Sequence, residues 1–318
     1  MSGTDVARDQ ACIAIAVATR RRPDGLARLL ASLSKLEIPD SCTIEVVIVE
    51  NDDPHARPLP PCALPVRRVF EPTQGIPVAR NRAIDEVAPT ADWIVFLDDD
   101  ETVEPSLVAR LFFASRATNA PIATGPALPR FESGSPAWAA RSGAYEPVRH
   151  AHLARVPYAF TNNVLFDARL VRGDDAPRLD ERMLHTGGSD REFFARLARA
   201  GHAIVWADDA IAYEWYPPAR ATYRWLFQRS LRLGTVAPAT ESMFEAPAHD
   251  AHPRRLPLRA RIALCWRAVR FAARAAVRAM QRIGDPPSAL ALASWDVGRS
   301  AGLVLAALGF AYEEYRSR

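Results

Sequence analysis

The chain has 318 residues, of which 49% are hydrophobic and 24% are charged, and this composition is typical of a globular protein with a large core. Its net charge of +3 is too small to indicate nucleic-acid binding, and because Lys35 is the only lysine, chemistry that needs a lysine is nearly excluded. The four cysteines have no metal-binding spacing, and we expect neither an export signal nor a membrane-spanning helix, so we expect a reducing, cytoplasmic location.

Strands and helices are predicted to alternate over the first hundred residues. The pattern predicts strands at 11–19, 44–49, 66–70 and 93–97, and helices at 26–36 and 77–87. This alternation is typical of βαβ units and of a parallel sheet. Each strand ends in polar or charged residues, so we expect one continuous cleft along the carboxyl edge of the sheet.

Beyond residue 101 the pattern is less regular. We expect a helix at 107–115, apolar strands at 122–125 and 202–206, and an irregular stretch at 126–157. A helix at 222–233 is predicted to end at Gly234, because glycine is common just after a helix. Proline- and histidine-rich residues at 236–257 then resemble a linker.

The tail, residues 258–318, is predicted to be helical. At 100° per residue five arginines lie on one side of the first helix (Arg267, Arg270, Arg274, Arg278, Arg282), and apolar residues lie on the other (Ile262, Cys265, Trp266, Val269, Ala273, Ala276, Met280). Two interpretations stay open: a packing helix with a solvated arginine face, or a basic helix lying on a membrane surface. Residues 290–310 are apolar but interrupted by charges, so we expect a buried helical partner there.

Four carboxylates follow the strand at 93–97, namely Asp98, Asp99, Asp100 and Glu101. Ligands of open α/β sheets bind outside the carboxyl ends of the strands, so a site is expected here. Carboxylates packed this closely resist joint ionisation, and a divalent cation would relieve the repulsion. Oxygen ligands suit Mg²⁺ or Mn²⁺. The alternative is a solvated acidic loop that caps the following helix.

Taken together, five motifs in order resemble those of the family 2 glycosyltransferases. They are Ala-Thr-Arg-Arg-Arg-Pro at 18–23, Val-Ile-Val-Glu-Asn-Asp at 47–52, Val-Ala-Arg-Asn-Arg-Ala-Ile at 78–84, Phe-Leu-Asp-Asp-Asp at 96–100, which is similar to the DxD motif, and Gly-Gly-Ser-Asp at 187–190. The resemblance covers residues 11–235 and implies an α/β GT-A fold, a Rossmann-like, mostly parallel sheet flanked by helices. It implies a nucleotide-sugar half at 11–101 and an acceptor half at 102–235, with the helical tail as a C-terminal extension.

The resemblance also implies roles for individual residues. Binding of the nucleotide sugar is expected of Thr19, Arg20, Glu50, Asp52, Arg80, Asn81, Asp98 and Asp99. The divalent cation, Mg²⁺ or Mn²⁺, is expected at Asp100 and Asp98, with Glu214 in place of a histidine that many relatives carry. Asp190 is the expected base, and the acceptor is expected near Gly188, Ser189, Asn163 and Trp138. The structural alternatives are a plain acid in the first turn of a helix for Asp190 and an ion-pair partner for Arg80.

The implied reaction is the inverting transfer of a single sugar from a nucleotide diphosphate sugar, with a UDP-sugar as the expected donor. The acceptor would be a carbohydrate or a lipid-linked glycan in surface polysaccharide synthesis, and a membrane surface is a further partner if the tail binds it. Two other functions stay open. Residues 95–102 also fit the DxDxT motif of haloacid-dehalogenase-like phosphatases, with Asp98 as nucleophile, and Ser189 leaves open a catalytically degenerate scaffold.

Overall fold

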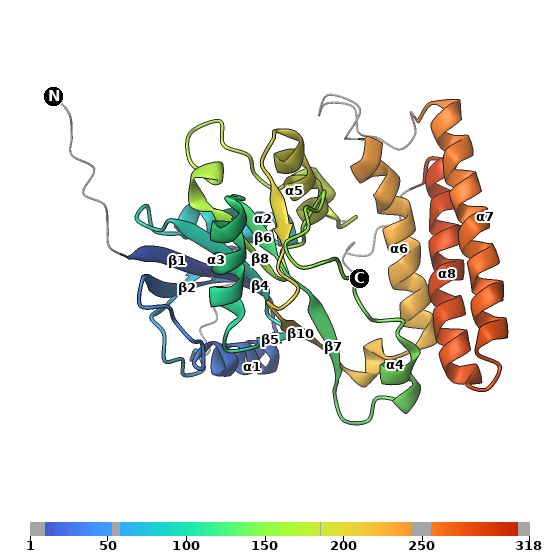
Figure 1. The fold of residues 1–318 in the computed structure, drawn as a ribbon, viewed down its shortest axis with the longest axis horizontal. Coiled ribbons are helices and arrows are strands. Elements are labelled where there is room, and N and C mark those ends of the chain that lie inside the picture. The colour runs from blue at the N-terminus through green and yellow to red at the C-terminus, as the bar shows by residue number, and fades with distance from the viewer. Residues whose placement is uncertain (1–9, 53–57, 185, 243–255, 311–318) are drawn as a thin grey trace. The chain divides into compact units, whose positions relative to one another are not determined.

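The computed structural model describes residues 10–52, 58–184, 186–242 and 256–310 (Figure 1). The chain forms two compact units, which are described separately. Unit 1 comprises residues 1–127, 149–179 and 200–213, and unit 2 comprises residues 128–148, 180–199 and 214–318.

The helices and strands of unit 1 are β1 (Ala11–Thr19), α1 (Pro23–Leu33), β2 (Cys42–Glu50), β3 (Val66–Phe70), α2 (Ile76–Glu86), β4 (Trp93–Asp98), β5 (Glu101–Val103), α3 (Leu107–Thr118), β6 (Ile122–Thr124), β8 (Val164–Asp167), the 3₁₀ helix η1 (Ala168–Val171) and β9 (Ile204–Trp206). Strands β7 (Ala127–Phe131) and β10 (Ala212–Tyr216) begin in unit 1 and end in unit 2. Unit 2 contains α4 (Ala137–Ser142), η2 (Glu181–Met183), α5 (Ser189–Arg199), η3 (Pro218–Arg220), α6 (Tyr223–Ser242), α7 (Leu258–Gln281) and α8 (Pro286–Ala307).

A seven-stranded sheet with strand order β3-β2-β1-β4-β8-β6-β9 forms the centre of unit 1. β8 pairs antiparallel with β4 and β6, and the other neighbouring strands are parallel. The register pairs Thr19 with Glu50 and Ala18 with Asp98, so the ends of β1, β2 and β4 meet at one edge of the sheet. A second sheet has three strands in the order β5-β10-β7.

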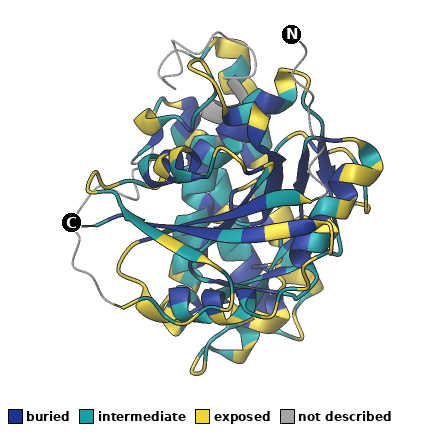
Figure 2. Ribbon diagram, turned by 90° about the vertical axis from the view of Figure 1, so that its left-hand side faces the viewer, coloured by how far each residue is buried: buried dark blue, intermediate teal, exposed yellow. Residues whose placement is uncertain are grey.

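The central strands of unit 1 are buried because both faces of the sheet are covered, as Figure 2 shows in dark blue. The apolar residues 13–17 of β1 are fully buried. Helix α1 packs on the sheet through Leu26, Leu29, Leu30 and Leu33, whose spacing of three or four residues places them on one face.

The predicted fold is confirmed: the protein has a mostly parallel α/β sheet flanked by helices, with C-terminal helices. Helix α1 begins at Pro23, three residues before the predicted start, because proline suits the first helical position. Strands β7 and β10 and helix α4 were not predicted. Each has six residues or fewer, and β7 contains a proline.

Three long helices of unit 2, α6, α8 and α7, lie side by side in Figure 1. The predicted end of α6 at Gly234 is wrong, because the helix continues to Ser242. Gly234 instead permits close packing: a Cβ atom there would lie 2.7 Å from the Arg299 carbonyl oxygen and from the Gly302 Cα. The predicted linker is shorter than expected, since 236–242 belong to α6, and its residues 243–255 lie outside the described part of the chain.

Helix α8 is the buried partner that the sequence predicted, with Ala291, Leu303 and Ala306 fully buried. Asp296 is also fully buried, and Arg278 of α7 donates a hydrogen bond of 3.0 Å to its Oδ2 atom. The interpretation of α7 as a helix that packs through the side with Ile262, Trp266 and Met280 is therefore wrong, because these side chains are exposed, Trp266 by 67%. Helix α7 contacts α8 through Leu264, Ala268 and Arg278 instead. Within the described residues no helix has the length and hydropathy needed to cross a membrane.

Candidate functional site

The four carboxylates at 98–101, where β4 ends and β5 begins, form an inward and an outward pair. Asp99 is 4% exposed and Glu101 is fully buried, whereas Asp98 and Asp100 remain partly exposed. Glu101 Oε2 accepts a hydrogen bond of 2.9 Å from the Asp98 backbone N–H, and Asp99 Oδ2 accepts one of 2.7 Å from the Thr19 hydroxyl. The inward carboxylates therefore hold the loop in place, and the outward ones are available to a ligand.

Two arginines hold the outward carboxylates. Arg80, in the first turns of α2, donates a hydrogen bond of 2.6 Å to Asp98 Oδ1. Arg22 donates from Nη1 to both Asp99 Oδ1 and Asp100 Oδ2, each at 2.8 Å. Burial raises the pKa of Asp99, and the adjacent Arg22 guanidinium opposes this shift. Arg80 therefore forms the ion pair that the sequence left open as an alternative to nucleotide-sugar binding, and the guanidinium groups of Arg80 and Arg22 lie beside the outward carboxylates.

The carboxylate oxygens of this loop are suitable ligands for Mg²⁺ or Mn²⁺. Asp98 and Asp100 offer only carboxylate oxygens, which are the ligands that these hard cations prefer. Among the described residues, no group of three or more His, Cys, Asp or Glu side chains is arranged to hold a metal ion. The residues fit a cation that one or two carboxylates hold and whose remaining ligands are water and substrate phosphates, as is common for Mg²⁺.

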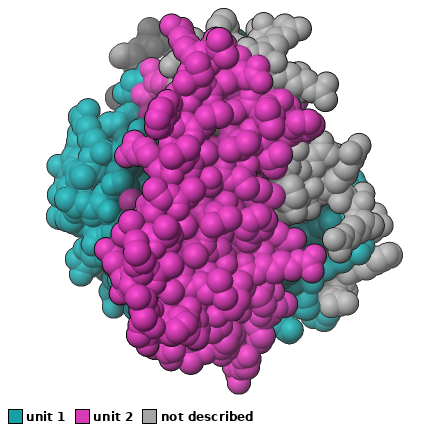
Figure 3. All heavy atoms as spheres, turned by 90° about the vertical axis from the view of Figure 1, so that its right-hand side faces the viewer, with its two compact units in different colours: residues 1–127, 149–179, 200–213 teal, residues 128–148, 180–199, 214–318 magenta. Residues whose placement is uncertain are grey.

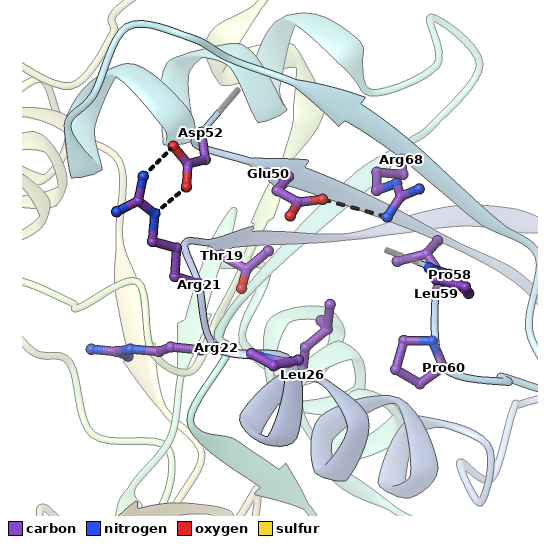
Figure 4. Close-up of a pocket in the computed structure, with 11 residues that line it drawn as sticks. Thr19, Arg21, Arg22, Leu26, Glu50, Asp52, Pro58, Leu59, Pro60 and Arg68 are labelled. Atoms are coloured by element: carbon purple, nitrogen blue, oxygen red, sulfur yellow. Dashed lines mark hydrogen bonds and ion pairs between the residues drawn. The ribbon is translucent and has the colours of Figure 1, made fainter. Parts of the chain in front are cut away.

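A pocket of about 280 Å³ lies in unit 1, at the edge where β1 and β2 end. Figure 4 shows the residues that line it; beside Pro23 these are Thr19, Arg21, Arg22, Leu26, Glu50, Asp52, Pro58, Leu59, Pro60 and Arg68. Arg68 of β3 donates a hydrogen bond of 3.4 Å to Glu50 Oε2, and Arg21 pairs with Asp52 through two nitrogens, Nη2 at 3.1 Å from Oδ1. The pocket combines apolar surface with paired charges at its rim.

The pocket contains some of the predicted residues and several that the sequence did not single out. Thr19, Glu50 and Asp52, which the resemblance assigns to nucleotide-sugar binding, line it. Arg20 is exposed and does not line it, whereas Arg21 and Arg22 do. Arg21 has a left-handed backbone with φ of 55°, so the local geometry decides which arginines of the triplet reach the pocket. In the sequence, the three consecutive arginines were the signal that could have identified Arg21 and Arg22 as pocket residues. No motif pointed to Arg68 or to the segment Pro58–Pro60.

Two predicted asparagines bind backbone groups within unit 1. The Asn81 side chain donates to the Leu179 carbonyl at 3.0 Å and accepts from the Leu179 N–H at 2.9 Å. Asn163 is fully buried and donates to the Pro126 and Ala210 carbonyls at 3.0 and 2.8 Å. A side chain with no exposed surface cannot touch an acceptor, so the expectation for Asn163 is corrected: it connects backbone segments. Asn81 likewise holds Leu179.

In unit 2 the Gly-Gly-Ser-Asp motif leads into helix α5. Gly187 and Gly188 have φ angles of 73° and 87°, a left-handed conformation that favours glycine, and a Cβ atom on Gly188 would overlap Val236 Cγ1. Ser189 is buried, and Asp190 is partly exposed in the first turn of α5. The Arg191 backbone N–H donates a hydrogen bond of 2.7 Å to Asp190 Oδ1. Asp190 thus accepts a hydrogen bond from a helix N–H and remains partly exposed to solvent.

The remaining two predicted residues also lie in unit 2. Trp138 stacks on Tyr223, with ring centroids 4.3 Å apart and planes inclined by 15°, so Tyr223 covers one of its faces. Glu214 lies 4.0 Å from Arg229 Nη2 and is partly exposed. Their proposed contacts to acceptor and metal stay predictions.

Comparison with known proteins gives consistent results. The family model described as Glycosyl transferase family 2 matches residues 14–173. The succinoglycan biosynthesis protein ExoM of Rhizobium meliloti (strain 1021) is 34% identical over 235 residues, which are 70% of this chain and 72% of that protein.

Solved structures also resemble the chain. The mannosyltransferase PcManGT from Pyrobaculum calidifontis, in complex with GDP-Man and Mn²⁺, has a TM-score of 0.58 and 18% identity, and the match covers 96% of this chain and 89% of that one. TarS 1–349 of S. aureus in complex with UDP has a TM-score of 0.46 and 13% identity, and the match covers 90% of both chains. The likeness to the mannosyltransferase shows a shared fold.

Proposed function

Because this chain belongs to glycosyl transferase family 2 and is a glycosyltransferase, we propose that it transfers a single sugar from a nucleotide diphosphate sugar to a carbohydrate or lipid-linked acceptor, with inversion at the anomeric carbon. The observation that carries this proposal is the pairing, in unit 1, of two outward carboxylates at the end of β4 with a pocket at the ends of β1 and β2. The family assignment argues against the phosphatase alternative, and the transfer assay described below tests the scaffold alternative.

The nucleoside of the donor is proposed to occupy the pocket of unit 1. The apolar side chains of Leu26 and Leu59 provide surface for a planar base. The Glu50 carboxylate can accept a hydrogen bond from a base N–H, and Arg68 keeps that carboxylate in position. Thr19 and Asp52 offer oxygens near the same edge for ribose hydroxyls. UDP is the proposed nucleotide.

The diphosphate is proposed to lie at Asp98 and Asp100. Negative charge grows on the diphosphate as the glycosidic bond breaks, so positive charge there stabilises the transition state. When bound at these two carboxylates, Mg²⁺ or Mn²⁺ supplies such charge. Arg80 and Arg22 orient the carboxylates through hydrogen bonds of 2.6 and 2.8 Å, and guanidinium groups suit phosphate oxygens. Glu214 is retained as a proposed additional oxygen ligand.

Asp190 is proposed as the base that takes the proton from the acceptor hydroxyl. A hydroxyl that attacks the face opposite the leaving diphosphate inverts the anomeric configuration, and a carboxylate must accept its proton. Oδ1 of Asp190 is held by the Arg191 N–H, which fixes the orientation of the carboxylate. Gly188, Ser189 and Trp138 are proposed to contact the acceptor.

A role in polysaccharide synthesis is proposed from the relative. ExoM is named as a succinoglycan biosynthesis protein, and its 34% identity over 235 residues supports a similar class of acceptor for this chain. We place the reaction in the cytoplasm, at the inner face of the cell membrane when the acceptor carries a lipid.

The experiment that tests this proposal separates binding from transfer. Wild-type protein and Asp190→Asn are assayed with UDP-glucose, UDP-galactose, UDP-N-acetylglucosamine and GDP-mannose, with Mn²⁺ and an extract of lipid-linked glycans, and release of nucleoside diphosphate is measured. We expect one donor to be consumed by the wild type, and the variant to lose about 10²–10⁴-fold in rate. Its UDP affinity should stay within about twofold of the wild type.

Three results would argue against the proposal. Equal loss of transfer and UDP binding in Asp190→Asn would make this residue structural. Turnover of p-nitrophenyl phosphate without any nucleotide-sugar turnover would favour the phosphatase alternative. Retention of the anomeric configuration in the product would exclude the direct displacement described above.

A further inference from the structure

Helix α7 presents an apolar face to solvent. Its buried residues Leu264 and Ala268 share a core with Leu303 and Ala306 of α8, and the buried Ala275 lies on the same side of the helix. The opposite side contains the set that we call the α7 apolar face: Ile262, Trp266, Val269, Ala273, Ala276, Val277 and Met280. Trp266 and Met280 are 67% and 63% exposed. At 100° per residue this face covers about a third of the helix circumference.

Positive charge accompanies this face. Residues 258–281 include six arginines and no acidic residue, so this one helix carries more positive charge than the chain's net charge of +3. Arg259 and Arg270 are exposed and lie along one border of the α7 apolar face. Arg278 and Arg274 approach the buried Asp296 of α8, at 3.0 and 3.8 Å, and thereby fix the rotation of α7 about its axis.

The buried ion pair explains why the apolar side faces outward. Asp296 is fully buried in the contact between α7 and α8, so it requires a cation from α7 on that side. Arg261 adds a second polar contact, a hydrogen bond of 2.6 Å from Nε to the Ala307 carbonyl. With arginines directed at α8, the apolar residues of the amphipathic helix are left on the outer side. Figure 3 colours the surface of unit 2, to which α7 belongs, in magenta.

We infer that the α7 apolar face binds an anionic lipid surface. An exposed apolar face bordered by arginines, with a tryptophan among its residues, is the pattern of a helix that lies in the plane of a membrane interface. Anionic headgroups complement the arginines, whereas the same face of a second copy has no acidic residue to pair with them. Helix α7 is not apolar enough to cross a bilayer, which fits a helix lying on the surface.

The test is flotation of the full chain with extruded vesicles, without donor or acceptor, so its outcome is independent of the transfer reaction. We expect the protein to float with vesicles that contain phosphatidylglycerol at low salt, and to float far less with pure phosphatidylcholine or at 0.5 M salt. The variant Trp266→Ser/Val269→Ser/Met280→Ser should lose at least about tenfold in partitioning. Arg259→Gln/Arg270→Gln should lose about fivefold for each arginine removed.

Matched controls come from exposed residues elsewhere. Phe113→Ser/Val148→Ser removes two apolar side chains that are 62% and 73% exposed, and Arg116→Gln/Arg199→Gln removes two exposed arginines. Both control variants should float like the wild type. Circular dichroism verifies folding, and the arginine variant remains informative if the triple variant does not fold.

Two outcomes would overturn the inference. The first is failure of the wild type to float with anionic vesicles at low salt. The second is a dimer, seen by light scattering, that the triple variant dissociates while flotation stays unchanged. In that case a second copy of the chain occupies the α7 apolar face.

Discussion

The acidic run after β4 illustrates how neighbouring residues of one type acquire different roles. Asp99 and Glu101 are turned inward, where they accept hydrogen bonds from the Thr19 hydroxyl and the Asp98 backbone N–H. Asp98 and Asp100 remain partly exposed. The sequence indicated a ligand site here and assigned Asp98 and Asp99 to the nucleotide sugar and Asp100 with Asp98 to the cation, but it did not indicate that Asp99 is buried. Only the turn of the chain after β4 decides which side chains can meet a ligand.

This division predicts opposite effects of two neighbouring substitutions. Asp99→Ala should lower the free energy of unfolding by about 2 kcal/mol, because the Thr19 hydroxyl would lose its partner in a buried position. Asp100→Ala should cost less than about 1 kcal/mol, because its partner Arg22 is half exposed, but it should weaken UDP binding in the presence of Mn²⁺. Urea denaturation and calorimetric titration of both variants measure the two effects. The reverse pattern would contradict the assignment of inward and outward carboxylates.

Other residue roles could be predicted in part. The positions of Thr19, Glu50 and Asp52 at the pocket follow from strand ends that a sequence can locate. The structural roles of Asn81 and Asn163 could not be predicted, because their partners, such as Leu179 and Ala210, are distant in sequence. Hydrogen bonds to distant backbone groups leave no local pattern.

At the scale of elements, the sequence predicts what local periodicity determines. Strands β1 and β3 have the predicted bounds, because β1 is an apolar run that ends at polar residues and β3 lies between Pro65 and Glu71. Helix α6 shows the opposite case. Gly234 resembles a helix end locally, but α8 packs so closely there that a glycine is needed within the helix. Tertiary contact, which the local pattern does not contain, decides between these interpretations.

The close approach of α6 and α8 makes a prediction for glycine substitutions. Gly302→Ala should lower the free energy of unfolding by about 1–2 kcal/mol, since its Cβ would overlap the Leu231 carbonyl and the cost exceeds the gain in helix propensity. Gly284→Ala is the control, because a Cβ there meets nothing within 4 Å. Urea denaturation compares the two variants. A Gly302→Ala protein as stable as the wild type would show that the helices do not pack this closely.

At the scale of the whole molecule, one buried acid links stability to pH. Burial raises the pKa of Asp296 to about 6 from an ordinary value of 3.8, although Arg274 lowers it. The folded protein therefore binds this proton more tightly than the unfolded chain does between these values. The stabilising contribution of Asp296 to the free energy of unfolding is fully present below pH 3.8 and is lost as the pH rises through about 6.

The comparison with Asp296→Asn isolates this contribution. Asparagine does not titrate, so the free energy of unfolding of the wild type relative to the variant should fall by about 3 kcal/mol between pH 3.5 and pH 7. Urea denaturation at several pH values measures this difference. A difference that does not change with pH, or that grows in favour of the wild type toward neutral pH, would contradict the raised pKa.

The central claim is that Asp98 and Asp100 of unit 1 bind the diphosphate of a nucleotide sugar through a divalent cation. Calorimetric titration of the full chain with UDP tests it most directly, in Mn²⁺ and in EDTA, for the wild type and for Asp98→Asn/Asp100→Asn. We predict that Mn²⁺ lowers the Kd of the wild type by at least about tenfold, which corresponds to about 1.4 kcal/mol, and has no effect on the variant. Equally tight UDP binding in EDTA, or an unchanged response to Mn²⁺ in the variant, would contradict the claim.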